Sequence, residues 1–260
     1  MPTNYPVLFT GAGPGDPELI TVKGQRALQN ADLVIYAGSL VPAALLKWTK
    51  PEATTINSAS MHLEEIIKTM EGFYARGKRI VRLHTGDPSL YGAIFEQIAE
   101  LNKKSIPYEV IPGVTAAFAA AAAMGIEFTL PEVSQTFIIT RMAGRTPVPE
   151  AEALESLAKH KASMAIYLSI TLVDEVAEIL KNGYGGDSSC AVAFRVSQPE
   201  EKITITNINN LARIVKKENI TDQALIIVGK VLDVSLDRLK YKSKLYDQKF
   251  THKYRDSVAG

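Results

Sequence analysis

The sequence LFTGAGPGDPELIT, residues 8–21, decides the fold, because it places a glycine-rich loop directly after a short apolar run. In nucleotide-binding α/β proteins such a loop joins the first strand to the first helix. The usual pattern there is G-x-G-x-x-G, followed by an acidic residue at the end of the second strand. Here the last position of the pattern is Asp16, and the next strand-like run, DLVIY at 32–36, ends in Tyr36. The loop is similar to a phosphate or adenosine cradle, but its usual constellation is incomplete.

The same loop also has a purely structural interpretation. Asp16 can cap the following helix by accepting a hydrogen bond, and Pro17 fits the first helical turn, which needs no amide donor. Asp32, the acidic residue of the second run, stands at the beginning of that run and not at its end. Spacing alone leaves both interpretations open.

Short apolar runs rich in β-branched residues alternate with helical patterns in the first half of the chain. The runs lie at 6–9, 32–36, 53–57, 79–84 and 108–111. Within the intervening stretch 62–78, apolar residues recur at helical spacing: Leu63, Ile66, Ile67, Met70 and Phe73. Gly77 ends that pattern, as glycine often does after a helix. This βα repeat predicts a mostly parallel sheet flanked by helices.

A second series of strand-like runs lies at 135–140, 163–168, 190–195, 202–206 and 223–229. Between them, apolar residues mark the core face of another helix: Leu172, Val173, Val176, Ile179 and Leu180. The run KITIT at 202–206 alternates, which favours an antiparallel strand with one solvated face. We therefore predict an α/β fold of two α/β domains with an active-site cleft between them. Residues 1–115 form the domain with the mostly parallel sheet, residues 116–240 form the domain with a mixed sheet, and the polar tail 241–260 frays.

Composition bounds the function classes. The 260 residues carry 29 Lys plus Arg against 28 Asp plus Glu, so a net charge of +1 does not favour a nucleic-acid partner. The single cysteine, Cys190, is expected to be a buried apolar side chain and forms neither a disulfide nor a metal cluster. The N-terminal stretch lacks a signal-peptide pattern, and the apolar stretch 114–126 is too short to span a bilayer. We expect a cytoplasmic protein without a membrane partner.

Two further glycine-containing loops follow predicted strands. HTGDPSLYG at 84–92 repeats the glycine, acid and proline order of the first loop. Asp87 either caps a helix or helps neighbouring amides hold a polar ligand group. His84 is either an acid–base group or an ordinary hydrogen-bonded residue. In IPGVTAA at 111–117, a Pro-Gly turn precedes Thr115 near a helix start. Because parallel strands share a carboxyl edge, the three loops are predicted to gather there, where open α/β sheets bind ligands.

Four stretches together resemble the tetrapyrrole methyltransferases that build cobalamin and sirohaem: GAGPGDPELIT (11–21), RLHTGDPSLYGA (82–93), VIPGVTAAFAAAA (110–122) and RMAGRTP (141–147). The resemblance runs in order over nearly the whole chain and ends with QALIIVG (223–229). Within the family, YAGSLV and LHTGDPSLYG most resemble enzymes that methylate C11 of precorrin-4 or cobalt-precorrin-4. Uroporphyrinogen III methyltransferases usually have aspartate in place of Ala37 and glycine in place of Thr85, which counts against that subfamily.

This resemblance implies C-methylation of a precorrin macrocycle at C11 in cobalamin biosynthesis. The methyl donor would be S-adenosylmethionine, leaving S-adenosylhomocysteine, and the protein would be a homodimer without a metal site. In this family the cofactor is bound between the two domains, so the missing acid after the second strand is expected. The glycine-rich first loop would then shape the tetrapyrrole side and touch the cofactor only through Pro14.

Carried over position by position, the resemblance implies a set of cofactor contacts: Pro14, Thr85, Gly86, Asp87, Leu90, Thr115, Ala116, Leu168, Ser197 and Ala224. Substrate contacts are expected at Gly13, Asp16, Arg141 and Arg145. Arginine can bind the substrate's carboxylates bidentately, although both arginines can equally be solvated surface charges. The reaction needs alignment and water exclusion more than a dedicated nucleophile. His84 and Tyr91 are the candidates for a base that removes a proton.

Two other functions stay open. One is methylation of another precorrin carbon or of uroporphyrinogen III by a protein of the same fold. The other is a non-catalytic protein that only binds a tetrapyrrole. Methylation of rRNA or protein is compatible with the fold, but the balanced charge gives it no support.

Overall fold

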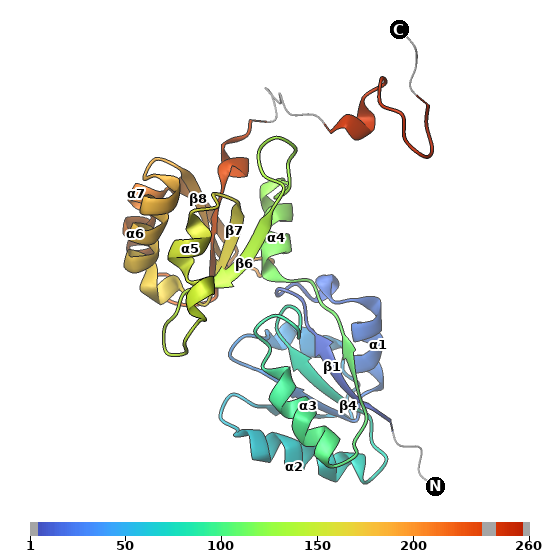
Figure 1. Ribbon diagram of the computed structural model, residues 1–260. Helices are drawn as coiled ribbons and strands as arrows, with labels where there is room; N and C mark the ends of the chain where they lie inside the picture. The colour runs from blue at the N-terminus through green and yellow to red at the C-terminus, as the bar shows by residue number, and fades with distance from the viewer. Residues whose placement is uncertain (1–4, 236–242, 257–260) are drawn as a thin grey trace. The chain divides into compact units, whose positions relative to one another are not determined.

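The computed structural model describes residues 5–235 and 243–256, and the chain forms two compact units (Figure 1). The first unit contains the described residues up to Ala120 together with the segment Arg195–Glu201. The second unit contains Ala121–Phe194 and the described residues from Lys202 onward. The sequence analysis had placed the domain boundary slightly earlier, at 115/116. Each unit has its own sheet, which confirms the predicted fold of two α/β domains.

The sheet of the first unit is fully parallel, as predicted. Its strands are β1 (Val7–Gly11), β2 (Leu33–Tyr36), β3 (Thr54–Asn57), β4 (Ile80–His84) and β5 (Tyr108–Ile111). They lie in the order β3-β2-β4-β1-β5, and every neighbouring pair is parallel. All five carboxyl ends therefore lie at one edge, and all five strands coincide with apolar runs of the sequence.

Helices cover both faces of this sheet. One face packs against α1 (Val22–Asn30) and the 3-10 helix η2 (Ala43–Trp48), with Leu28, Val34 and Leu83 in the shared core. The other face packs against α2 (Leu63–Tyr74) and α3 (Ile94–Lys103). The predicted core positions of α2 are confirmed, because Ile66, Ile67 and Met70 are buried and Leu63 and Phe73 pack against them. Gly77 follows the helix end with a φ of +68°, a conformation that suits glycine.

The second unit has a mixed sheet, which is also as predicted. Its strands are β6 (Phe137–Arg141), β7 (Ser163–Tyr167), β8 (Ser189–Phe194), β9 (Lys202–Asn207) and β10 (Ala224–Val228). The order is β6-β7-β10-β8-β9, with β6 and β7 parallel and the other neighbours antiparallel. β9 is antiparallel to β8, but no β9 residue is buried. The predicted antiparallel pairing of this run is confirmed, and β9 is an edge strand with Ile205 55% exposed.

Three helices share one apolar core with the second sheet: α5 (Leu154–Ala158), α6 (Val173–Tyr184) and α7 (Ile208–Lys217). Val173, Val176 and Leu180 of α6 are buried in it, as their spacing predicted. Cys190 on β8 is fully buried, and burial raises the pKa of its thiol to about 12. The thiol is therefore a protonated apolar group, which agrees with the sequence analysis.

The remaining elements are one α-helix and several 3-10 helices. They are α4 (Ala116–Met124), which contains the division between the units, and the 3-10 helices η1 (Pro17–Leu19), η3 (Glu150–Glu152), η4 (Ile170–Leu172), η5 (Lys230–Asp233) and η7 (Lys244–Tyr246). Of the tail predicted to fray, residues 241–242 and 257–260 lie outside the described residues, and the described part forms η7 and a bridge between His252 and Arg255. Within residues 5–235 and 243–256, no helix is long and apolar enough to cross a membrane.

Candidate functional site

Three glycine-containing loops converge at the carboxyl edge of the first sheet. Gly11 ends β1, Gly86 follows β4 and Gly113 follows β5. A Cβ atom on Gly113 would lie 2.1 Å from the carbonyl oxygen of Gly86 and 2.8 Å from the Cα of Gly11. Only glycine allows three backbones to approach so closely. The predicted gathering of the loops at one sheet edge is confirmed.

Backbone hydrogen bonds join the first loop to the second. Gly13 and Gly86 form an isolated antiparallel bridge, in which each amide donates to the other's carbonyl at 3.2 and 2.8 Å. The amide of Ala12 donates to the carbonyl of His84 at 2.7 Å. Both bridging glycines have positive φ angles, +79° for Gly13 and +59° for Gly86. The two loops therefore form one backbone unit.

The joined loops lie at the switch point of the sheet. β1 and β4 are neighbours, yet the chain leaves β1 toward α1 on one face and leaves β4 toward α3 on the other. Where adjacent parallel strands send their connections to opposite faces, a crevice opens beyond their carboxyl ends. Ligands of open α/β sheets bind in such crevices, so the first two loops occupy the expected ligand position.

Asp87 ties the second loop to the third and does not cap a helix. Its Oδ2 accepts a hydrogen bond from the Gly113 amide at 2.8 Å, and its Oδ1 accepts one from the Ser89 amide at 2.8 Å and another from the Ser89 hydroxyl. Partial burial raises the pKa of Asp87, but these hydrogen bonds outweigh burial and leave the pKa below its ordinary value. The helix-cap alternative is wrong, because α3 begins only at Ile94.

Asp16, in contrast, has the capping role that the structural interpretation gave it. Its side chain accepts a hydrogen bond from the Glu18 amide at 2.8 Å, and Pro17 occupies the first turn of η1. The element is a short 3-10 helix, and α1 follows with its own cap, Thr21. The backbone amide of Asp16 donates to the hydroxyl of Ser197 at 2.9 Å.

His84 is buried, with only 5% of its surface exposed. Its ring stacks on Phe9, with 5.9 Å between ring centroids, and its Nε2 has no hydrogen-bond partner among the described residues. Burial, and secondarily the charge of Arg82, lowers the pKa of His84 to about 3. The imidazole is therefore neutral near pH 7 and shielded from solvent, which leaves little support for a role in proton transfer.

Arg82 is a buried charged residue beside His84 that the sequence did not single out. It is 6% exposed, and its guanidinium donates to Gln97 at 3.1 Å and to the carbonyl of Ile35 at 3.3 Å. Burial lowers the pKa of Arg82 to about 10. The described residues offer this charge no carboxylate. Its place inside a strand-like run gave no signal, because alternating strands often carry a polar residue at every second position.

Several predicted site residues have left-handed backbone conformations. The φ angles are +55° for Tyr91, +53° for Leu168 and +64° for Ser197, and Ala93 beside the second loop has +48°. Such conformations are costly for residues other than glycine and concentrate at functional sites. Leu168, directly after β7, is also 63% exposed, which is unusual for a large apolar side chain held in a strained conformation.

The other predicted cofactor residues lie in the same loops or at strand ends. Thr85 and Leu90 belong to the second loop and are partly exposed. Thr115 is buried directly before α4, and Ala116 is the first residue of that helix. Pro14 is buried in the first loop. Ala224 begins β10 of the second sheet, and Ser197 lies in the loop that follows β8.

The two arginines of RMAGRTP differ in their surroundings. Arg141 ends β6, and its guanidinium donates to the carbonyl oxygens of Met142, Thr146 and Pro147 at 3.4, 3.2 and 2.7 Å. Arg141 therefore shapes its own loop. Arg145 is exposed, and its side chain has no hydrogen bond or ion pair among the described residues.

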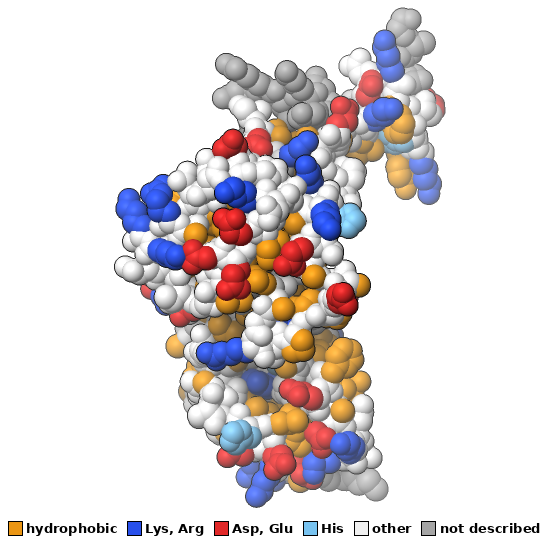
Figure 2. Space-filling view, turned by 60° about the vertical axis from the view of Figure 1, so that its left-hand side comes forward, with side chains coloured by type: hydrophobic (Ala, Val, Ile, Leu, Met, Phe, Trp, Pro, Cys, Tyr) orange, Lys and Arg blue, Asp and Glu red, His pale blue; other side chains and the backbone are white. Residues whose placement is uncertain are grey.

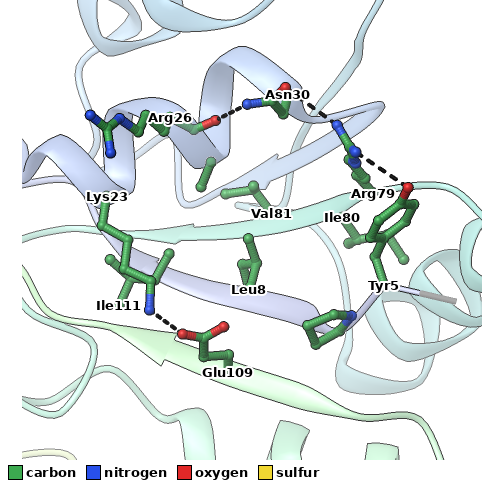
Figure 3. Close-up of a pocket in the computed structure, with 12 residues that line it drawn as sticks. Tyr5, Leu8, Lys23, Arg26, Asn30, Arg79, Ile80, Val81, Glu109 and Ile111 are labelled. Carbon is green, nitrogen blue, oxygen red and sulfur yellow. Dashed lines mark hydrogen bonds and ion pairs between the residues drawn. The ribbon is translucent and has the colours of Figure 1, made fainter. Parts of the chain in front are cut away.

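Charged side chains are dispersed elsewhere. Figure 2 shows Lys, Arg, Asp and Glu side chains interspersed on the face drawn. Among the residues that the structure describes, no three His, Cys, Asp or Glu side chains gather as metal ligands. A groove of about 420 Å³ lies between α1 and the strands β1, β4 and β5 of the first sheet, lined by Tyr5, Lys23 and Arg79 among others (Figure 3). It contains none of the predicted site residues. Asp32, at the beginning of the second strand-like run, is paired with Lys50 at 2.7 Å and accepts a hydrogen bond from the Arg79 amide.

Comparison with known proteins identifies the family. The sequence profile described as Tetrapyrrole (Corrin/Porphyrin) Methylases matches residues 6–212. The chain belongs to the tetrapyrrole methylase family. This tetrapyrrole methylase is 52% identical over 258 residues to the cobalt-precorrin-4 C(11)-methyltransferase of Methanocaldococcus jannaschii, covering 99% of this chain and 98% of the relative. The family expected from the sequence motifs is confirmed.

Two solved structures are similar to this tetrapyrrole methylase over most of its length. A cobalt-precorrin-4 methyltransferase has a TM-score of 0.85 and 46% identity, covering 88% of this chain and 96% of that one. The uroporphyrin-III C-methyl transferase of Thermus thermophilus, complexed with S-adenosylhomocysteine, has a TM-score of 0.73 and 26% identity, covering 89% and 100%. The similarity is greater to the precorrin-4 enzyme than to the uroporphyrin enzyme.

Proposed function

We propose that this tetrapyrrole methylase transfers a methyl group from S-adenosylmethionine to C11 of precorrin-4 or its cobalt complex, in cobalamin biosynthesis. The observation that carries the proposal is the joined pair of loops at the switch point of the first sheet, in a chain 52% identical to an enzyme of that name. Ala37 stands where uroporphyrinogen III methyltransferases usually have aspartate, which supports the choice of substrate.

The residues present fit the methyl donor. An exposed leucine in a strained backbone conformation has no packing role, but it suits contact with an apolar ligand surface, as Leu168 would make. In the first unit, we propose contacts from Pro14 and from the loops after β4 and β5: Thr85, Gly86, Asp87, Leu90, Thr115 and Ala116. In the second series of strands and loops, Ser197 and Ala224 are further proposed contacts.

The chain's own residues supply alignment and shielding. When bound, S-adenosylmethionine supplies a methyl group on a sulfonium, which is already a strong electrophile. The loops hold the methyl donor so that the substrate carbon can approach in line, at about 3–3.5 Å. No acid or base is required for that transfer, which agrees with the burial and neutrality of His84. Tyr91 is the proposed acceptor of a proton released after the transfer, because this residue of the second loop is 43% exposed.

The substrate's carboxylates need local positive charge, because the net charge is only +1. We propose that Arg145 binds a carboxylate directly, since no described residue occupies its guanidinium. Gly13 and Asp16 would shape the floor beneath the macrocycle. Arg141 contributes by holding the loop between β6 and α5 in shape through its three backbone contacts.

Arg145→Ala is expected to raise KM for the tetrapyrrole about tenfold to a hundredfold, because a charge-assisted hydrogen bond contributes about 1.5–3 kcal/mol. S-adenosylmethionine affinity and thermal stability should stay within error. Arg141→Ala should instead lower stability, because the loop loses three hydrogen bonds. Steady-state kinetics with each substrate varied, together with thermal unfolding, measures both. An unchanged tetrapyrrole KM in Arg145→Ala would make that residue a solvated surface charge.

Asp87→Ala is expected to weaken S-adenosylmethionine binding at least tenfold by calorimetry, because the second and third loops lose the bond between Asp87 and the Gly113 amide. Ser89→Ala is the matched control. It removes a hydroxyl that contacts the same carboxylate but leaves the link to Gly113 in place, so affinity should change less than threefold. An equal loss of S-adenosylmethionine affinity in both variants would show that the bond between Asp87 and Gly113 does not determine cofactor binding.

Multiple-turnover assays with labelled S-adenosylmethionine test the proposal itself. Precorrin-4 and cobalt-precorrin-4 are compared with uroporphyrinogen III as methyl acceptors. We expect many turnovers with at least one precorrin-4 form and a rate at least a hundredfold lower with uroporphyrinogen III. Equal rates would reject the substrate assignment, and tetrapyrrole binding without turnover would favour a non-catalytic binding protein. We also propose a cytoplasmic homodimer without nucleic-acid or membrane partners, which sedimentation and cell fractionation test.

A further inference from the structure

We infer that Glu201 is a positioning residue, which holds Ser197 so that the Ser197 hydroxyl fixes the glycine-rich first loop for tetrapyrrole binding. The two residues belong to the segment Arg195–Glu201, which joins β8 to β9 and is here called the latch. The latch clusters with the first unit, although its neighbours in sequence belong to the second. The role in substrate binding rests on the proposed function, whereas the role in loop geometry does not.

The latch contacts the first loop through two consecutive residues. The Ser197 hydroxyl accepts the hydrogen bond of the Asp16 amide at 2.9 Å, across 181 positions of sequence. Beside it, the Gln198 side chain packs on Gly15, so that a Cβ atom on Gly15 would lie 2.3 Å from the Cγ of Gln198. Two neighbouring latch residues thus meet two neighbouring loop residues, and a larger residue at position 15 would not fit.

Ser197 needs a partner to keep this position. Its φ angle is +64°, and that of Arg195 is +43°, in a region that residues other than glycine avoid. The Ser197 amide donates to Oε2 of Glu201 at 2.6 Å, a short bond to a charged acceptor. Turns within the latch add two weaker restraints, from Gln198 to the Arg195 carbonyl and from Glu201 to the Gln198 carbonyl. The Glu201 carboxylate therefore stabilises the strained conformation of Ser197 through this hydrogen bond.

The first loop is held from both sides. On its N-terminal side Gly13 bridges Gly86, and on its C-terminal side Asp16 is bonded to Ser197. Pro14, the proposed cofactor contact, lies between these two anchors. If the Glu201 anchor is lost, the Asp16 amide loses its acceptor while the Gly13 bridge remains. The loop then moves on its tetrapyrrole side, and the cofactor loops after β4 and β5 are unaffected.

Glu200 provides a matched control. It is the adjacent acidic residue, and its carboxylate lies 3.9 Å from the Arg195 guanidinium without bonding the Ser197 amide. Removing either glutamate changes the net charge equally. If Glu201→Ala and Glu200→Ala differ in their effects, the difference therefore comes from the lost hydrogen bond to Ser197 and not from the lost negative charge.

The test compares Glu201→Ala, Glu201→Gln and Glu200→Ala by amide NMR and steady-state kinetics. In Glu201→Ala, the Asp16 and Ser197 amide resonances should shift and tetrapyrrole KM should rise at least fivefold. S-adenosylmethionine affinity should fall by less than tetrapyrrole affinity, because only the proposed contacts of Ser197 and Pro14 are displaced and those from the loops after β4 and β5 remain. Glu201→Gln keeps a neutral acceptor and should restore much of the KM. Glu200→Ala should resemble the unmodified protein in every measurement.

Several results would overturn the inference. Unchanged Asp16 and Ser197 resonances in Glu201→Ala would remove the positioning role. A drop in unfolding temperature with unchanged tetrapyrrole KM would reduce Glu201 to a stabilising contact. Failure of the unmodified protein to methylate any tetrapyrrole would reject the proposed function instead, and the amide resonances would still decide the loop contact.

Discussion

Lowering the pH should destabilise the folded protein through His84, and His84→Phe should remove that part of the acid sensitivity. The pKa of His84 is about 3 in the folded protein, against about 6.5 for an exposed histidine. Between pH 3 and pH 6.5, the His84 imidazole is protonated in the unfolded chain and neutral in the folded protein. The free energy of unfolding therefore falls by about 1.4 kcal/mol for each pH unit below about 6.5, and by about 5 kcal/mol when pH 3 is reached.

Urea unfolding at pH 7, 6, 5 and 4 measures this effect as the difference between the unmodified protein and His84→Phe. Phenylalanine keeps the ring that stacks on Phe9 and removes a buried nitrogen that has no partner among the described residues. As the pH falls, the free energy of unfolding of His84→Phe should rise steadily relative to that of the unmodified protein. Exposed His160 offers a control, because His160→Gln also removes one imidazole but leaves the buried His84 in place. Parallel curves for the protein and His84→Phe would contradict the buried, neutral state.

The same variant separates structure from catalysis. If His84 takes no part in proton transfer, His84→Phe should retain methyl transfer within about threefold at pH 7.5. A rate of methyl transfer lowered a hundredfold or more, as is typical when a general acid or base is removed, would show that His84 takes part in catalysis.

Gly113→Ala should be among the most damaging single substitutions in the chain. The new Cβ atom would lie 2.1 Å from the Gly86 carbonyl oxygen and 2.8 Å from the Gly11 Cα, and these backbone atoms cannot move without breaking the joined loops. We expect a loss of about 3 kcal/mol or more in the free energy of unfolding, together with loss of S-adenosylmethionine binding. Denaturant unfolding and calorimetry measure the two effects.

Gly72→Ala is the control for that substitution. Gly72 lies in α2, and a Cβ atom there would meet no atom within 4 Å. Alanine should therefore stabilise the helix by about 0.5–1 kcal/mol, because glycine is a poor helix former. If both substitutions had similar small effects, the close approach of the three loops would not exist in solution.

Much of the fold was predictable because local patterns determine it. Every strand overlaps an apolar run of the sequence, and a βα repeat brings the loops of a parallel sheet to one edge. The three glycine-containing loops were therefore predicted to gather at one edge, whereas the close approach of Gly11, Gly86 and Gly113 emerges only in the structure. The edge position of β9 was not predictable, because strand order in a mixed sheet depends on pairing between distant segments.

The site was less predictable than the fold, and the reasons are physical. The sequence left open whether Asp87 caps a helix, because no local pattern shows that the chain makes a turn before α3 and that the carboxylate reaches Gly113 on another loop. The bond between Asp16 and Ser197 spans 181 positions, and no local pattern reports it. Arg82 looked like an ordinary strand residue, and His84 was a candidate base. Neither burial was predictable, since burial of a polar side chain is a property of the packed structure alone.

The position of the transferred methyl group tests the central claim most directly. The protein is incubated with precorrin-4 or cobalt-precorrin-4 and S-adenosylmethionine carrying a ¹³C-labelled methyl group, and the product is examined by NMR. We predict one new labelled methyl group, bonded to C11 of the macrocycle. A labelled methyl group on any other ring carbon, or an unmethylated macrocycle recovered with the protein, would contradict the account.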